Sequence, residues 1–136
     1  MAEPTPLRGP RIRKTPVPDD AFVVVRGDDL EAGTTRRQAL AFRARFADWA
    51  RYGISAYYAR TDAEIDDLAS DHLERFPELA IYSTHDLVVG GFEVVPTFRT
   101  PHVTITFTGD LDDGLSRLDG LRVDMRPNPY HDGDET

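Results

Sequence analysis

The sequence predicts an α+β domain with a mixed β-sheet of about five strands and helices packed mainly on one face. Short apolar runs typical of strands alternate with segments whose apolar residues recur at helical spacing. The predicted order is β-α-β-α-β-(α)-β-β-α, which is typical of a sheet with helices packed against it. A length of 136 residues with 40% hydrophobic residues suits one domain.

The composition excludes several classes of protein. The chain has no cysteine, so it has no disulfide framework, no thiolate zinc site and no cysteine nucleophile. The sequence has no uninterrupted apolar stretch of about 18 residues, and no membrane partner is expected. The start of the chain, MAEPTPLRGPRIRKTP, lacks the apolar core of a secretory signal. A cytoplasmic location is therefore expected.

The chain divides into three parts. Residues 1–19 hold five of the ten prolines and four basic residues, which predicts a flexible basic arm that is solvated or docks on a partner. Residues 20–126 form the single α+β domain, and residues 127–136 form an acidic tail.

Charge is distributed unevenly along the chain, whose net charge is −8. Residues 1–60 carry eleven basic and seven acidic side chains, a net charge of +4, whereas residues 61–136 carry five and seventeen, a net charge of −12. The net charge disfavours nucleic acid as a partner. A basic face in the first half could still meet phosphates or an acidic protein, or the two halves could neutralise each other within the fold.

The first half of the domain contains two predicted strands and one helix. Residues 21–25 form an apolar run that suits a buried strand, and residues 54–58 predict a second strand. Between them Thr34 or Thr35 caps a helix that Gly53 ends. The buried stripe of this helix consists of Ala39, Phe42, Phe46, Trp49 and Ala50.

The second half begins with a capping box, Thr61 and Glu64, which opens a helix that Pro77 stops. Residues 79–82 predict a third strand, and a short helical turn follows at residues 85–89. Residues 92–98 and 102–107 predict a hairpin, and residues 111–118 a last short helix.

Two candidate site residues lie at the ends of the first two strands. Arg26 could bind a phosphate with both guanidinium nitrogens, or it could form an ion pair with a nearby carboxylate. Ser55 could bond a substrate, with Gly53 allowing a close approach, or its hydroxyl could satisfy backbone groups at the helix–strand junction.

His102 is the strongest candidate for a catalytic residue. Strand alternation places it on one face with Thr104, which could orient the substrate, and Arg99, close in sequence, could bind phosphate. Such a histidine could transfer a proton in an attack on a phosphodiester, or it could be a structural rim residue. The triplet His102-Val103-Thr104 resembles half of the pattern of two-histidine phosphoesterases, whose second triplet this chain lacks.

His85 follows Ser83 and Thr84 at a helix start, where it could be a second proton carrier or phosphate ligand, although capping alone explains the pattern. The chain contains neither a phosphate-binding P-loop nor a dinucleotide-binding glycine turn. Its acidic runs lack the spacing of a calcium loop. We therefore expect no metal and no cofactor.

Four sequence segments carry resemblances to known groups. The skeleton VVRG, YGIS, GFE and PH resembles a group of small actinobacterial proteins with no established activity, over roughly residues 20–130. Arg26 and Ser55 resemble the strand-borne pair of ADP-ribosyltransferase toxins, although the catalytic glutamate of that family has no clear counterpart. Gly91-Phe92-Glu93 with His102 is similar to small RNase toxins, whose upstream half this chain lacks.

The sequence thus supports two hypotheses of different classes. The first is a small enzyme acting on RNA or a nucleotide, such as the toxin of a toxin–antitoxin or defence module, whose partner is an antitoxin or assembly subunit. The second is a non-catalytic adaptor that binds an acidic partner through the arm and the arginines of residues 36–45. An enzyme should gather Arg26, Ser55 and His102 in one pocket, whereas an adaptor should scatter them.

Overall fold

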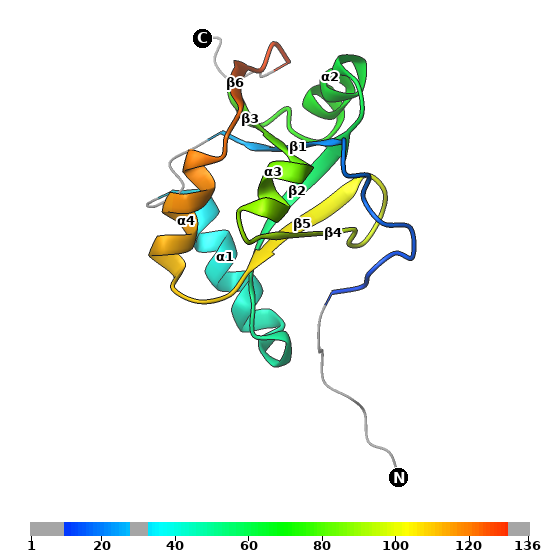
Figure 1. Cartoon of the computed structure of the whole chain (residues 1–136). Helices are drawn as coiled ribbons and strands as arrows, with labels where there is room; N and C mark the ends of the chain where they lie inside the picture. Colours follow the sequence, from blue (N-terminus) through cyan, green and yellow to red (C-terminus); the bar gives the residue numbers. More distant parts are fainter. Residues whose placement is uncertain (1–9, 28–32, 131–136) are drawn as a thin grey trace.

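A computed structural model describes residues 10–27 and 33–130 of the chain (Figure 1). The remaining residues of the predicted arm (1–9) and of the predicted tail (131–136) lie outside the described part. The described elements are β1 (Phe22–Arg26), α1 (Thr34–Arg45), the 3₁₀ turn η1 (Ala47–Trp49), β2 (Tyr52–Ala59), α2 (Asp62–Asp71), β3 (Glu78–Ser83), α3 (Thr84–Val89), β4 (Glu93–Val95), β5 (His102–Phe107), α4 (Leu111–Gly120) and β6 (Asp124–Pro127).

The α+β class is confirmed, with a six-stranded sheet in the order β4-β5-β2-β1-β3-β6. The prediction of a mixed sheet is wrong, because every strand pair in the described part is antiparallel. The reason lies in α1, which runs antiparallel to β2 rather than crossing back over the sheet. Gln38 of α1 contacts Ser55, and Phe42, one turn later, lies over Gly53 at the start of β2.

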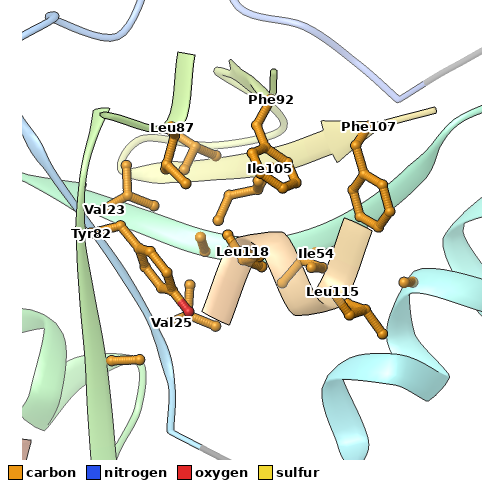
Figure 2. Packing of buried hydrophobic residues seen from close by; sticks show 14 of the residues in the cluster. Val23, Val25, Ile54, Tyr82, Leu87, Phe92, Ile105, Phe107, Leu115 and Leu118 are labelled. Carbon is orange, nitrogen blue, oxygen red and sulfur yellow. The ribbon is translucent and has the colours of Figure 1, made fainter. Parts of the chain in front are cut away.

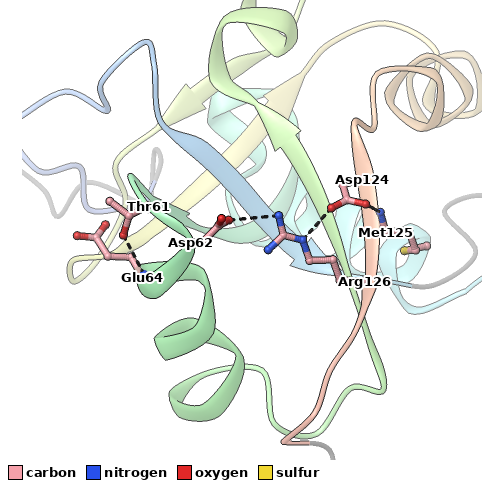
Figure 3. Close-up of polar contacts among 6 residues, drawn as sticks. All are labelled: Thr61, Asp62, Glu64, Asp124, Met125 and Arg126. Carbon is pink, nitrogen blue, oxygen red and sulfur yellow. Dashed lines mark hydrogen bonds and ion pairs between the residues drawn. The ribbon is translucent and has the colours of Figure 1, made fainter.

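The strand absent from the prediction is β6. Its sequence, Asp-Met-Arg-Pro, has neither an apolar run nor strong alternation, so nothing local indicates a strand. It is held at the sheet edge by pairing with β3 and by Arg126, which binds Asp124 of its own strand and Asp62 of α2 at 2.7 and 3.3 Å (Figure 3). Beyond it, the buried Asn128 side chain donates to the carbonyl oxygens of Leu73 and Phe76.

Three helices, α1, α3 and α4, contribute to the core on one face of the sheet, which agrees with the prediction of helices mainly on one face. On that face Ala39 of α1, Leu87 of α3 and leucines of α4 such as Leu115 and Leu118 meet the inward residues of the central strands (Figure 2). On the other face α2 packs against β1 and β3. Since β1 is Val-Val-Val at its centre, it has apolar side chains for both layers.

The predicted capping box of α2 is confirmed. The backbone N–H of Glu64 donates to Oγ1 of Thr61 at 3.1 Å (Figure 3). The Glu64 carboxylate in turn accepts from the N–H of Arg60, one residue before Thr61. Helix α1 differs from its prediction, because Gly33 is its N-cap and Thr35 is buried inside the first turn. Among the described helices none is both long and apolar enough to cross a bilayer.

Part of the N-terminal arm lies against the domain. Ile12 forms a β-bridge with Thr97, the N–H of Arg13 donates to the carbonyl of Pro96, and the N–H of Phe98 donates to the carbonyl of Arg11. Residues 11–13 therefore act as a short strap over the segment that joins β4 to β5.

Candidate functional site

A side chain of α1 takes the place of a partner strand for β2 beyond the point where its pairing with β1 ends. The pairing of β1 with β2 ends at Val24 and Tyr57, so Ser55 has no partner strand on that side. The Gln38 side chain fills this place, because its Oε1 accepts from the N–H of Ser55 at 2.9 Å and from Arg26 at 3.1 Å. Two donors on Oε1 fix the orientation of the amide, which leaves its NH₂ group for other partners.

The other side of β2 pairs with β5, and the register brings the candidate residues together. Ser55 lies opposite Thr104, and Tyr57 lies opposite His102. Paired residues of antiparallel strands point to the same face. Ser55, His102 and Thr104 therefore share one face of two neighbouring strands.

A chain of hydrogen bonds links four side chains at this place. Oγ of Ser55 lies 2.7 Å from Nε2 of His102, and Nδ1 of His102 lies 2.8 Å from Oγ1 of Thr97. Oγ1 of Thr97 continues to Oγ1 of Thr104 at 2.7 Å. Thr97 and Thr104 are both buried, so their hydroxyls hold the imidazole in a fixed orientation. The arrangement is that of a hydroxyl, a base and an orienting group.

Arg13 of the strap supports this chain from outside. Its Nη1 donates to the carbonyl oxygens of Thr97, at 2.7 Å, and of His102, at 2.9 Å. The Arg13 guanidinium thus links Thr97, which orients the imidazole, to His102, which carries it. Arg13 is a positioning residue, because its hydrogen bonds go to backbone oxygens and not into the cavity.

His102 has a pKa below its ordinary value of 6.5. Burial is the largest cause, a backbone hydrogen bond to Thr97 opposes it, and the charges of Arg13 and His72 lower the pKa further. The imidazole is therefore neutral at pH 7. With its proton on Nδ1, the ring donates to Oγ1 of Thr97, and Nε2 can accept the proton of Ser55.

A cavity of about 230 Å³ opens beside the pair. Its polar lining consists of Gln38, Arg45, Ser55, His102 and Thr104. Its apolar lining consists of Ala41, Phe42, Phe46, Gly53 and Phe98. None of these residues is acidic, although the chain has 24 Asp and Glu residues. Arg45 lies at the rim of the cavity, whereas Arg13 and Arg26 lie behind its wall, bonded to His102 and Gln38. The positive charges of these three side chains favour an anion in the cavity.

The structure brings three of the predicted site residues, Ser55, His102 and Thr104, to one cavity. The others lie elsewhere. Arg26 is behind Gln38, with its guanidinium over the ring of Phe76 at 4.9 Å. Arg99 is exposed and contributes its backbone carbonyl to the N–H of His102. His85 is exposed and lies 3.4 Å from a carboxylate oxygen of Asp19.

Sequence reasoning missed Gln38, Thr97, Arg13 and Phe98. Gln38 is the one uncharged polar residue between Arg37 and Arg43, which was a usable signal. Arg13 offered none, because it meets Thr97 and His102 across 84 and 89 residues of sequence. Thr97 lies only five residues before His102, but nothing in its own sequence context marks it as a partner of the imidazole. Phe98 was assigned to a strand, whereas β4 ends at Val95.

The described residues contain no group of three or more His, Asp or Glu side chains placed to hold a metal ion. In comparisons with known proteins, no family model matches the chain, and no curated protein and no solved structure matches it either.

Replacing Thr97 with valine is expected to lower the free energy of unfolding by about 1–3 kcal/mol, because Nδ1 of His102 and the hydroxyl of Thr104 lose their buried partner. Thr97→Ser keeps the hydroxyl and serves as the matched control, with a loss of about 1 kcal/mol for one methyl group. Urea unfolding of the three proteins measures the difference. Equal losses in both variants would contradict a role for the hydroxyl.

Proposed function

We propose that this chain is a small enzyme that acts on a phosphate-bearing substrate, RNA or a nucleotide, as the toxin of a toxin–antitoxin or defence module does. The observation that carries the proposal is the hydrogen bond between Ser55 Oγ and His102 Nε2 inside a cavity. A neutral histidine bonded to a hydroxyl is the minimum that general-base activation requires.

The substrate class rests on charge. The cavity has Arg45 at its rim and no acidic lining residue, while Asp112 and Asp113 of α4 lie elsewhere in pairs with Arg36 and Arg117. The NH₂ group of Gln38 adds an uncharged donor beside Ser55. Hydrogen-bond donors with no carboxylate beside them in the cavity suit the oxygens of a phosphate group, on which charge develops during transfer.

Two reactions fit this arrangement. In the first, His102 takes the proton of Ser55, Oγ forms a bond to phosphorus, and the ester bond to the leaving oxygen breaks as His102 returns the proton to it; a water that His102 deprotonates then hydrolyses the phosphoserine. In the second, His102 takes the proton of a ribose 2′-hydroxyl, which attacks the adjacent phosphodiester to form a 2′,3′-cyclic phosphate. The displaced 5′-oxygen takes a proton from water, and Ser55 only orients the substrate.

A single variant, Ser55→Ala, separates the two reactions. The wild-type protein is expected to arrest growth of a bacterial host on controlled induction, with cleaved RNA or consumed nucleotide in the lysate. If Ser55 is the nucleophile, Ser55→Ala abolishes the activity; if it is an orienting group, the loss is about tenfold. Purified wild-type protein that turns over neither single-stranded RNA nor any nucleotide would sink the proposal.

The adaptor hypothesis has less support. Its Arg-rich helix face is partly used within the fold, since Arg36 pairs with Asp112 and the Arg43 guanidinium lies 4.9 Å from the centre of the Tyr52 ring. The part of the arm that is described lies on the domain through residues 11–13. These contacts remove cationic groups that an acidic partner would need.

A further inference from the structure

Phe98 has an unusual conformation for its residue type. It lies at the cavity with φ of +59°, in the left-handed region, and 40% of its surface is exposed. A bulky side chain is rare at such a φ, and folding alone gives no reason to place an exposed aromatic ring there. Residues held in such conformations cluster at ligand sites.

The ring of Phe98 forms one part of an aromatic lining. Its centroid lies 5.3 Å from that of the His102 imidazole, at an interplanar angle of 53°. Phe42 and Phe46 line the same cavity from α1, and their centroids are 4.9 Å apart. The guanidinium of Arg45 lies over the Phe46 ring at 4.9 Å. The aromatic part of the cavity, lined by Phe42, Phe46 and Phe98 and called the slot below, thus lies between His102 and the cationic Arg45.

We propose that this slot binds one unpaired nucleobase of the substrate, stacked on Phe98, with the attached phosphate directed to Arg45. This inference rests on the proposed function and adds the part of the substrate that the cavity recognises. Stacking on aromatic side chains is how proteins hold unpaired bases, and each base contributes about a five- to hundredfold gain in affinity. A volume near 230 Å³ suits a single base with part of its sugar.

The geometry also excludes a base pair. A base inside the slot has one face on Phe98 and its edge toward Gln38, whose remaining groups are N–H donors. A paired base has its edge and both faces occupied within the duplex. The slot therefore takes free nucleotides or single-stranded RNA and rejects duplex RNA.

The test compares Phe98→Gly with Ala50→Gly. Both positions have positive φ, so glycine relieves strain in each, but Ala50 is not among the cavity residues. Binding of AMP, ribose 5-phosphate, a single-stranded tetraribonucleotide and a short RNA duplex is measured by NMR titration. The wild type should bind AMP at least tenfold more tightly than ribose 5-phosphate. Phe98→Gly should lose that preference without a lower melting temperature, and Ala50→Gly should keep it.

Each outcome decides the matter. Equal affinity of the wild type for AMP and ribose 5-phosphate overturns the base slot and leaves the phosphate-directed enzyme in place. Binding of neither overturns both proposals. Duplex bound as tightly as single strand overturns the exclusion of paired bases. Tighter binding of the tetranucleotide than of AMP assigns the slot to RNA, and the reverse assigns it to free nucleotides. Phe98→Asn tolerates the same φ without an aromatic ring, so it repeats the test if the glycine variant unfolds.

Discussion

Replacing His102 with alanine is expected to reduce turnover by about 10²–10⁴-fold, the range that a positioned general base contributes. The imidazole is the only group hydrogen-bonded to both Ser55 and Thr97 in the described part of the chain, so the variant removes the proton acceptor and its orientation together. Steady-state kinetics on the substrate identified with the wild type measures the loss. His85→Ala is the matched control, because that exposed histidine faces Asp19 instead of the cavity.

The pH dependence of the wild type tests the same assignment. His102 accepts a proton only when neutral, which is the case above its pKa, and that pKa is lowered below 6.5 by burial. The activity should therefore be fully present at pH 7 and fall as the pH drops through the lowered pKa. Arg13→Gln removes a nearby positive charge, so it should move this midpoint to higher pH. A midpoint that does not move would show that Arg13 exerts no field on His102.

The Gly53→Ala variant is expected to lose both stability and ligand binding. A Cβ at residue 53 would lie 2.5 Å from Cδ1 of Phe42 and within 2.8 Å of other ring atoms. The ring has to move, which costs about 1–3 kcal/mol in a packed site. Because Phe42 forms a wall of the cavity, its displacement also closes the space beside Ser55.

Gly120→Ala is the control for Gly53→Ala. A Cβ at residue 120, the last residue of α4, meets no atom within 4 Å, so alanine there should be neutral or stabilise by up to about 1 kcal/mol. Thermal unfolding and ligand titration of both variants measure the two effects. A Gly53→Ala protein that binds its ligand normally would show that the cavity adjusts without Phe42.

The part of the fold that could be predicted from sequence is the part with local signals. The Thr61 and Glu64 capping box marks α2, and strand alternation places His102 and Thr104 on one face. Strand direction could not be predicted, because it depends on how α1 packs beside β2. The strand Asp124–Pro127 could not be predicted either, since its stability comes from β3 and from Asp62.

The site residues likewise divide into those with a local signal in the sequence and those that only the packing brings together. Ser55 and His102 could be selected from their residue types and from the predicted strand starts, although Ser55 lies inside β2. Thr97 orients the imidazole from a segment after β4, where a threonine has many ordinary roles. Arg26 drew attention as a phosphate ligand, yet its guanidinium contacts Gln38 and Phe76, which only the packing of α1 and α2 determines.

The strap has a consequence for the timing of synthesis. Arg13 is bonded to Thr97 and His102, residues that lie 84 and 89 positions later in the chain. At about 5–20 residues per second, a ribosome needs several seconds or more to make that interval. During this time the nascent chain contains Arg13, and later Ser55, but not yet Thr97 or His102. The proposed activity therefore cannot begin before His102 has been translated.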